Sequence, residues 1–500
     1  MNSPASLRLP AAEPSAADPL ADLFARQRAA FAAGDAAPCA ERIEWLNLLE
    51  QALLRRRYEL AQAISADFHG RAVEETLMLE VFGLVDEIRH TRHQLRRWMK
   101  PRRVASNWQF WPSRSSIRYQ PLGVVGVMGA FNYPLYVALS PAIGALAAGN
   151  HVLVKPSELA PRCGEVMTEL VSGVLPAERI AVVSGGLELS KAFAALPFDH
   201  LIFTGSPGVG RHILRAAADN LTPVTLELGG KSPAILDQRY PMARAAEAIV
   251  HAKLLNAGQT CVAPDYVLVP QARRQEFLDC ARAAGERFYP SLAANPHYTR
   301  IISEREYQRL QGWLDEAREQ GAKADIVNPA GESCDVTNRV FPFTLVWDCP
   351  PSARLLRDEI FGPILPVLGY DSLDAAIAGI NRGERPLALY LFSDDHTTRE
   401  HVLRRTISGG VTLNGCIYHV AQHRLPLGGV GNSGMGRYHG FDGFETFSRK
   451  KPIFHLSRWT NLALMRPPYG RAFQWLLGTL LRGRLAREVL PHRGGGADHG

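Results

Sequence analysis

The chain has 500 residues, of which 46% are hydrophobic and 21% are charged. A chain of this length is too long for one simple core and is expected to form two or three globular units. Its seven cysteines include no CxxC pair and no Cys/His cluster at metal-ligand spacing. This pattern argues against a disulfide framework and against a metal site, so no metal is predicted.

The N-terminal residues 1–19 are rich in Pro, Ala and Ser and are predicted to form a disordered leader. They lack the basic start and the apolar core of a secretory signal. No stretch of the chain reaches the ~18 consecutive apolar residues of a membrane-spanning helix. We therefore expect a cytoplasmic protein, either free or peripheral to the inner face of the membrane.

The net charge of +7 arises near the C-terminus, because residues 449–500 hold ten Lys/Arg and only two acidic residues. Apolar residues at helical spacing alternate there with arginines, so residues 458–500 are predicted to form a basic amphipathic tail. Such a tail either contacts a membrane surface or packs on the body or on a second subunit. No RNA-recognition, zinc-finger or helix-turn-helix pattern occurs, so no nucleic-acid partner is expected.

Residues from about 20 to 100 alternate apolar and charged positions with a helical period, which predicts a helical lead-in that ends at Pro101. Short apolar runs follow and alternate with helical segments: PLGVVGVMGAF, HVLVKP, IAVVSGG, HLIFTG and VTLELGG. A second such set, with DYVLVP, ILPVLGY and VTLNG, extends from about 230 to 413. This alternation is typical of parallel sheets, so the sequence predicts two α/β domains with a cleft between them.

Three residues stand out as candidates for nucleophilic chemistry. Cys261 lies in the turn-like NAGQTCVAPD, which can present both its sulfur and its backbone N–H, although a lone free cysteine is more often a buried hydrophobe. Asn132 in GAFNYP follows a predicted strand and is placed to donate to an oxyanion. Glu227 ends the apolar strand of TLELGGKSP, where desolvation would raise its pKa toward that of a useful base.

Two further motifs indicate a nucleotide site. HLIFTGSPGVG supplies a strand, a glycine turn from Gly205 to Gly210 and a helix start at Ser206. This is not GxGxxG, and alone it is weak evidence for a dinucleotide. VLVKPSE adds Lys155 and Glu158 beyond another strand, where a carboxylate would accept the hydroxyls of an adenosine ribose and repel a 2′-phosphate.

Taken together, these motifs resemble the aldehyde dehydrogenase superfamily from about residue 20 to 455. FNYP, KPSE, FTGSPGVG, LELGGKSP, NAGQTC, EIFGPILPV and LPLGGVGNSGMGRYHG occur in the family's order. The continuation CVAPDY looks like the class 3 branch. Within that branch, EIRHTRHQLRRWMKPRRV, LPFDHLIFTG and KLLNAGQTCVAPDYVLVP resemble bacterial coniferyl aldehyde dehydrogenases.

The resemblance implies a role for each candidate. Cys261 would attack the aldehyde, Asn132 and the Cys261 backbone N–H would hold the oxyanion, and Glu227 would activate the water that hydrolyses a thioester. The implied cofactor is NAD, with NADP as an alternative. The implied cofactor contacts are Lys155, Glu158, Gly205, Ser206, Gly210, Glu359 and Phe361. Tyr133 and Tyr418 are candidates for the wall of the substrate pocket.

The resemblance also implies an architecture of two parallel-sheet α/β domains, one Rossmann-like for the cofactor and one catalytic, with a small β oligomerisation arm. The expected boundaries are 20–101 and 122–228 for the NAD(P)-binding domain, 229–413 for the catalytic domain, and 102–121 and 414–457 for the arms, between the leader and the tail. A homodimer is expected by analogy with the family.

The expected reaction is oxidation of coniferyl aldehyde to ferulic acid through a thiohemiacetal and a thioester. Two alternatives stay open: a dehydrogenase of medium-chain or long-chain aliphatic aldehydes, and a catalytically idle scaffold or membrane-binding protein of this fold. Two departures from the family's pattern bear on the site. Ala130-Phe131 stands where many members have Pro-Trp, and SPGVG stands where Ser-Thr is more usual after the first glycine.

Overall fold

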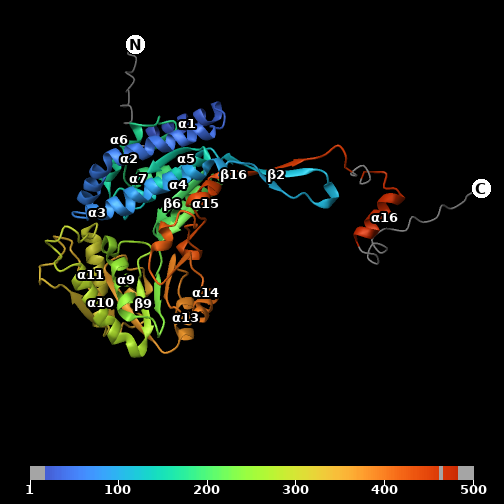
Figure 1. Cartoon of the computed structure of the whole chain (residues 1–500). Helices are drawn as coiled ribbons and strands as arrows, with labels where there is room; N and C mark the ends of the chain where they lie inside the picture. Colours follow the sequence, from blue (N-terminus) through green and yellow to red (C-terminus); the bar gives the residue numbers. More distant parts are fainter. Residues whose placement is uncertain (1–16, 461–465, 482–500) are drawn as a thin grey trace, which may run out of the picture. The chain divides into compact units, whose positions relative to one another are not determined.

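The computed structural model describes residues 17–460 and 466–481 (Figure 1). By internal contacts these residues divide into two units. One unit contains the described residues up to 98 together with 120–449, and the other contains 99–119 with the described residues from 450 onward. The predicted leader lies mostly outside the described residues, and its last residues, from Ala17, already belong to a helix.

The chain begins with the expected helical lead-in. Its elements are α1 (Ala17–Ala33), α2 (Cys39–Asp67), α3 (Val73–Thr76), a π-helical turn (Leu77–Phe82) and α4 (Gly83–Trp98). The long α2 buries an apolar stripe that includes Trp45, Leu49, Leu53 and Leu60. This stripe packs on α6 and α5, which explains why apolar residues recur there with a helical period.

The first sheet has six strands in the order β15-β7-β6-β3-β4-β5. Its strands are β3 (Val124–Met128), β4 (His151–Lys155), β5 (Ile180–Val182), β6 (His200–Gly205), β7 (Val224–Leu228) and β15 (Gly434–Met435), and its helices are α5 (Tyr136–Ala148), α6 (Pro161–Ser172), α7 (Leu187–Ala194) and α8 (Pro207–Ala218). All strands are parallel except β15, which pairs antiparallel with β7. The chain order reverses between β3 and β6, as in a Rossmann-like sheet, so the predicted cofactor-domain fold is confirmed.

The second sheet has seven strands in the order β10-β11-β12-β9-β8-β13-β14. Its strands are β8 (Pro233–Leu236), β9 (Tyr266–Pro270), β10 (Lys323–Val327), β11 (Phe343–Trp347), β12 (Ile364–Tyr370), β13 (Ala388–Phe392) and β14 (Gly410–Leu413). Its helices are α9 (Met242–Leu254), α10 (Arg274–Phe288), α11 (Glu304–Glu319), α12 (Arg354–Arg357), α13 (Leu373–Arg382) and α14 (His396–Arg405). Only β10 runs antiparallel to its neighbour. Two parallel α/β domains are therefore confirmed.

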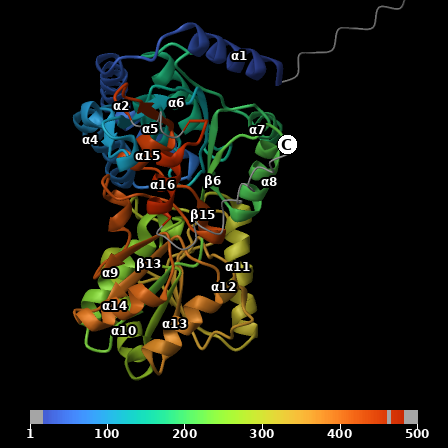
Figure 2. The ribbon, with the colours of Figure 1, turned by 90° about the vertical axis from the view of Figure 1, so that its right-hand side faces the viewer.

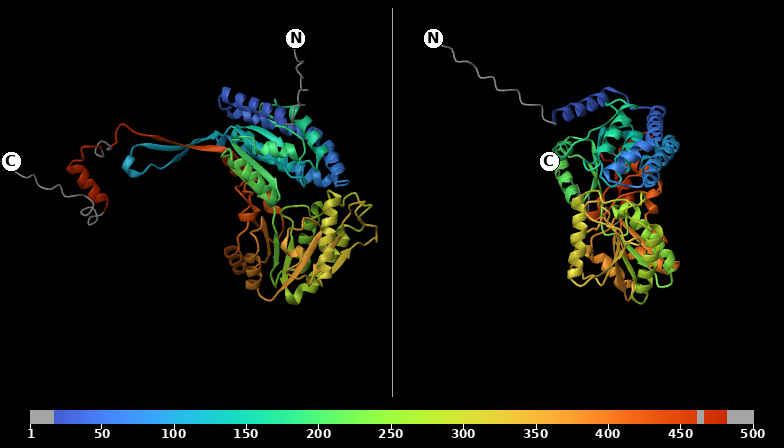
Figure 3. Two further views of the ribbon diagram at one scale, coloured as in Figure 1. Left: turned by 180° about the vertical axis from the view of Figure 1, so that it is seen from behind. Right: turned by 90° about the vertical axis from the view of Figure 1, so that its left-hand side faces the viewer.

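Each sheet carries its own helices. Figure 1 shows α2, α4, α5 and α6 gathered around the first sheet, and α9, α10, α13 and α14 gathered around the second. Figure 3 shows the same two groups from behind, the first blue to green and the second yellow-green to orange. After β14 the chain returns to the first sheet, where it adds β15 and α15 (Gly440–Thr446), and Figure 2 shows β15 close to β6. This return explains why residues 414–449 belong to the larger unit although they were expected in the arms.

The smaller unit is built on a three-stranded sheet in the order β1-β2-β16. Its elements are β1 (Arg102–Val104), a 3₁₀ turn (Trp108–Phe110), β2 (Arg114–Pro121), β16 (Ser448–His455) and α16 (Arg471–Leu480). The rings of Phe110 and Phe454 meet edge to face at 5.4 Å, while Trp111 and Trp459 are exposed. Within the described residues, no helix is both long and apolar enough to cross a membrane.

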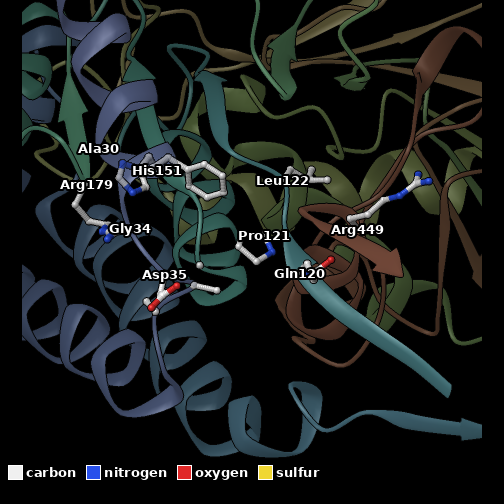
Figure 4. A pocket seen from close by; sticks show the side chains of 13 residues that line it. Ala30, Gly34, Asp35, Gln120, Pro121, Leu122, His151, Arg179 and Arg449 are labelled. Atoms are coloured by element: carbon white, nitrogen blue, oxygen red, sulfur yellow. The ribbon is translucent and has the colours of Figure 1, made fainter. Parts of the chain in front are cut away.

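A cavity of about 460 Å³ opens at the amino edge of the first sheet (Figure 4). It is lined by Leu122, which precedes β3, by His151, the first residue of β4, and by Arg179, which precedes β5. Figure 4 shows Arg449 across the cavity from His151 and Arg179. None of the residues predicted to form the site lines this cavity. It lies at the opposite strand ends from those residues.

Candidate active site

Four predicted residues lie at the carboxyl edge of the first sheet. Asn132 follows β3, Lys155 ends β4, Ser206 follows β6 and Glu227 lies near the end of β7. Parallel sheets bind ligands at this edge, next to the place where the strand order reverses. In this sheet that place lies between β3 and β6. The first sheet therefore presents Asn132 and Ser206 on either side of its expected ligand crevice.

The second sheet contributes its amino edge instead. Cys261 precedes β9 and Glu359 precedes β12. Helix α9 carries the chain back from the carboxyl end of β8, and Cys261 is reached before the next strand begins. The idea that site residues follow their strands therefore holds for Asn132 and Ser206, but not for Cys261. The site is made where the carboxyl edge of one sheet meets the amino edge of the other.

The loop before Cys261 has an unusual backbone. Asn256, Ala257 and Gly258 are consecutive residues with positive φ angles of 52°, 51° and 75°. A left-handed conformation costs a non-glycine residue roughly 1–2 kcal/mol. A Cβ on Gly258 would lie 2.3 Å from the Gly362 carbonyl oxygen, so a glycine is required there. The sharp turn is what brings Cys261 out of the helix and up to the cleft.

Side-chain hydrogen bonds hold this turn in place. Gln259 Nε2 donates to the carbonyl oxygens of Asn256 and Arg300, both at 3.0 Å, and Gln259 Oε1 accepts from Ile302 N at 3.0 Å. Asn256 Nδ2 donates to the Gln259 carbonyl oxygen at 3.1 Å. Both side chains are buried. The Gln259 amide, bonded at both its nitrogen and its oxygen, resists displacement because breaking these bonds would leave buried polar atoms unsatisfied.

One carbonyl group links the two halves of the site. The backbone oxygen of Asn132 accepts from Asn256 Nδ2 at 2.9 Å and from Arg71 Nη1 at 3.2 Å. Arg71 is fully buried, forms an ion pair with Glu80 at 2.8 Å, and lies 4.8 Å from the centre of the Tyr133 ring. The bonds of the Asn132 backbone thus fix this residue to the loop of Cys261. They leave its side-chain amide available to another partner.

The thiol of Cys261 is protonated in this environment. Burial raises its pKa well above the usual range, and the neighbouring carboxyl groups of Glu227 and Glu359 raise it further. The backbone N–H groups of Cys261 and Val262 act in the opposite direction, with a smaller effect. The same N–H groups are the kind of donor that stabilises a negative charge forming beside the sulfur. The thiol must therefore lose its proton when the sulfur attacks a substrate, and the hydrolysis that follows needs a base for water.

Glu227 is the base that the structure offers. It is 3% exposed, and neither carboxylate oxygen has a hydrogen-bond partner among the described residues. Desolvation by burial raises its pKa from 4.5 to about 8. In the sheet it pairs with Thr204 on β6 and with Gly434 on β15. A carboxyl group of this kind takes up and releases a proton near neutral pH.

The predicted cofactor residues surround the helix start after β6. Ser206 caps α8 by accepting from Val209 N at 3.4 Å, with Pro207 as the first helical residue. The SPGVG variant of the turn therefore still forms a capped helix N-terminus, which suits a pyrophosphate. A Cβ on Gly210 would lie 2.9 Å from the Leu228 side chain, so this glycine permits close packing of α8 on β7.

Two further parts of the site suit the other moieties of a dinucleotide. Lys155 is buried and forms an ion pair with the half-exposed Glu158 at 3.1 Å, a suitable pair for ribose hydroxyls. Burial raises the pKa of Glu359 to about 8, and a Cβ on Gly229 would lie 2.0 Å from Glu359 Oε2. The Glu359 carboxyl group therefore packs directly against the Gly229 backbone, where no side chain would fit. These residue types fit NAD(P).

The aromatic candidates differ in their positions. Tyr133 O–H lies 2.9 Å from the hydroxyl of Thr260, next to Cys261. The ring of Phe361 meets that of Phe131 edge to face at 5.8 Å, so Phe131 lies beside a residue expected to contact the cofactor. Tyr418 is 58% exposed in a short 3₁₀ helix (Tyr418–Ala421). Only Tyr133 is thus joined by a hydrogen bond to the segment of the thiol.

Sequence reasoning missed four residues that hold this site: Arg71, Lys231, Asn256 and Asp265. Three of them stand in motifs that drew attention for other residues, in GGKSP, NAGQTC and CVAPDY. Lys231 and Asp265 could have been identified from the sequence, because each is a charged residue inside an otherwise apolar or glycine-rich motif. Arg71 lies far from every motif, so no local signal marks it.

Comparison with known proteins supports the fold and the activity. The sequence pattern of the aldehyde dehydrogenase family matches residues 9–453. The "Probable coniferyl aldehyde dehydrogenase" of Pseudomonas aeruginosa is 47% identical, over 91% of this chain and 94% of that protein. The "Coniferyl aldehyde dehydrogenase" of Pseudomonas sp. strain HR199 is 42% identical, over 94% and 97%.

A solved structure, titled "Substrate bound state of Staphylococcus Aureus AldH", is 35% identical to this chain. The likeness has a TM-score of 0.87 and covers 92% of this chain and 99% of that one. Family pattern, relatives and fold agree over nearly the whole chain. The protein is therefore an enzyme of the aldehyde dehydrogenase family, which oxidises aldehydes with NAD(P).

Proposed function

We propose that this enzyme oxidises coniferyl aldehyde to ferulic acid, with Cys261 as nucleophile, Asn132 as oxyanion donor and Glu227 as general base. The observation that carries the roles is the pairing of a partly buried thiol with a buried carboxyl group that has no hydrogen-bond partner among the described residues. A residue kept free of partners in such a place is free to bond to water or substrate. The names of the relatives support the choice of aldehyde.

The chain's own residues carry out two half-reactions. In the first, Cys261 Sγ bonds to the aldehyde carbon and the thiol proton leaves to solvent, while the Asn132 side chain and the Cys261 backbone N–H stabilise the oxyanion. NAD(P), when bound, supplies the hydride acceptor that converts this adduct to a thioester. In the second, Glu227 takes a proton from a water molecule that attacks the thioester, and the acid leaves as the Cys261 thiolate is released.

We propose NAD as the preferred cofactor. Glu158 is half-exposed beside the buried Lys155, and its carboxylate would accept the ribose hydroxyls of NAD but repel the 2′-phosphate of NADP. The Lys155 ammonium attracts that phosphate, so use of both cofactors is the alternative. Replacement of Glu158 by Gln should lower kcat/KM for NAD and raise it for NADP.

The substrate is tested by comparing kcat/KM for coniferaldehyde with that for octanal and decanal, each measured with NAD and with NADP. A higher value for coniferaldehyde supports the proposal, and a higher value for the alkanals indicates the aliphatic alternative. If no aldehyde supports reduction of either cofactor, the protein is an idle scaffold of this fold.

We further propose a cytoplasmic homodimer. The exposed indole rings of Trp111 and Trp459 beside the β1-β2-β16 sheet support a contact between subunits, and sedimentation equilibrium tests it. The tail is proposed to contact membrane through α16, whose Trp475 is 73% exposed. Part of that tail lies outside the described residues. Equal pelleting of the full chain and of a chain truncated at residue 458 with anionic vesicles would reject the membrane contact.

A further inference from the structure

We propose that Lys231 and Asp265 are positioning residues, whose pair fixes the cofactor loop (residues 354–362) against the segments that carry Glu227 and Cys261. The inference rests on the proposed function of those residues. Lys231 follows Glu227 by four positions, and Asp265 follows Cys261 by four positions. Glu359, one of the expected cofactor contacts, lies within the third segment. This one ion pair, between a partly buried lysine and a buried aspartate, therefore joins three segments that are far apart in the sequence.

Lys231 holds the cofactor loop by its carbonyl groups. Its ammonium group donates to the carbonyl oxygens of Leu355 at 2.8 Å and Asp358 at 2.9 Å. Its third bond goes to Asp265 Oδ2. The three donors of a lysine are thus all used. Asp358 immediately precedes Glu359, so the position of Glu359 depends directly on this ammonium group.

Asp265 holds the same loop by an amide group. Its Oδ1 accepts from Ile360 N, the residue after Glu359, at 3.0 Å. Its own backbone N–H donates to the carbonyl oxygen of Ser232 at 2.8 Å, next to Lys231. Lys231 and Asp265 therefore bracket Glu359 from both sides along the chain. Charge-assisted bonds of this kind are about twice as strong as neutral ones.

A second buried lysine completes the arrangement. Lys253 is fully buried, lies 3.9 Å from Asp265 Oδ1, and has no hydrogen-bond partner for its ammonium nitrogen among the described residues. Desolvation lowers its pKa to about 8. Asp265 therefore faces two cations, and removing its charge would take away the carboxylate that lies within ion-pair distance of both ammonium groups. Because one carboxylate serves two ammonium groups, loss of the whole Asp265 side chain should disturb the arrangement more than loss of either lysine.

The pair sets the position of the loop, while other contacts keep it folded. Leu355 and Ile360 are buried in a hydrophobic core beneath α11, and Arg309 Nη2 donates to the Ile360 carbonyl oxygen at 2.9 Å. The space around the Glu359 carboxyl group is narrow, because a Cβ at Gly229 would already overlap it. A small shift of the loop therefore displaces Glu359 without unfolding the domain.

The test uses Lys231→Met, which keeps the aliphatic stem and removes the ammonium group. NAD binding is measured by calorimetry, and hydrolysis of p-nitrophenyl acetate, which needs the nucleophile and no cofactor, is measured in parallel. We expect the Kd and KM for NAD to rise about tenfold or more, because a misplacement of ~1 Å at a site costs that much. Ester hydrolysis should stay within about twofold of wild type.

Asp265→Asn is the milder second variant, because its amide oxygen can still accept from Ile360 N while the negative charge is lost. The matched control is Lys323→Met, which removes an ammonium group from an exposed ion pair with Asp348 and should change neither quantity. Unchanged NAD affinity in both pair variants overturns the proposal. A parallel loss of ester hydrolysis and NAD binding, with a lower unfolding temperature, also overturns it, since the pair would then serve general stability.

The proposed function is tested separately in the same assay. If Cys261→Ala hydrolyses the ester as well as wild type does, then the nucleophile is wrongly assigned. The calorimetric change in Lys231→Met would still report on the cofactor loop, so the two failures are distinguishable.

Discussion

Glu227 and Asp265 are equally buried, each 3% exposed, but their surroundings are opposite. Asp265 accepts from Ile360 N and faces two lysine ammonium groups, whereas neither oxygen of Glu227 has a partner among the described residues. A carboxylate bonded in this way holds its neighbours in place. A desolvated one without partners has its pKa raised to about 8 and can exchange protons. The site combines both kinds of carboxyl group.

The largest effect is expected from loss of the Cys261 thiol. Glu227 can act as a base for hydrolysis only if Cys261 has first formed a thioester. Cys261→Ala should abolish aldehyde oxidation, even in a single turnover. The measurement is reduced cofactor formed per enzyme after rapid mixing. Cys163→Ala, which removes a buried thiol far along the chain from Cys261, is the control and should retain the burst. A burst from Cys261→Ala would mean that the reaction does not go through this sulfur.

Asn132→Ala removes the proposed oxyanion donor and keeps the backbone carbonyl that bonds to Asn256 and Arg71. We expect kcat to fall by ~10²–10³-fold, as on loss of an oxyanion donor elsewhere. Steady-state kinetics measures it, with Asn220→Ala as a control, since Asn220 bonds to the Ala195 carbonyl oxygen in an exposed position. A rate close to wild type would reject the oxyanion role.

The raised pKa of Glu227 predicts the pH dependence. Only the ionised form is a base, so kcat should rise about tenfold per pH unit below a midpoint of about 8 and level off above it. A profile of kcat between pH about 6 and about 10 checks this. A flat profile through pH 8 would show that the base titrates elsewhere.

The same pKa predicts a smaller effect on stability. Between 4.5 and about 8 the folded state keeps the Glu227 proton that the unfolded state releases, so wild type loses stability as pH rises through this window. Above pH 8 the folded protein bears the full free-energy cost of a buried, ionised Glu227. Glu227→Gln cannot ionise, so its unfolding temperature should exceed that of wild type by more at pH about 9 than at pH about 5. An equal difference at both pH values would contradict the raised pKa.

The sequence allowed prediction of what is local. Strand and helix alternation predicted both sheets. Asn132 and Glu227 were marked as polar residues at the ends of predicted strands, and Cys261 as a cysteine in a turn-like segment. What could not be predicted is what depends on long-range contacts. Arg71 and Asn256 meet at the Asn132 carbonyl from 61 and 124 positions away, and nothing in their local sequences indicates this.

The position of Cys261 relative to its strand became clear only from the folded structure. The carboxyl-edge rule placed Asn132 correctly and gave no reason for Cys261, which precedes its strand because three consecutive residues adopt left-handed conformations. Asn and Gly favour that region, but Ala257 does not. The turn therefore depends on the buried side chains of Asn256 and Gln259, whose partners are known only from the folded structure.

The most direct test of the account is a rapid-mixing experiment on Glu227→Gln with coniferaldehyde and NAD. Glutamine occupies the same space but cannot accept a proton from water. The account predicts that the burst of reduced cofactor, one per active site, is kept, while the steady-state rate falls by ~10²-fold or more. An unchanged steady-state rate after the burst would contradict it, because another group would then activate the water.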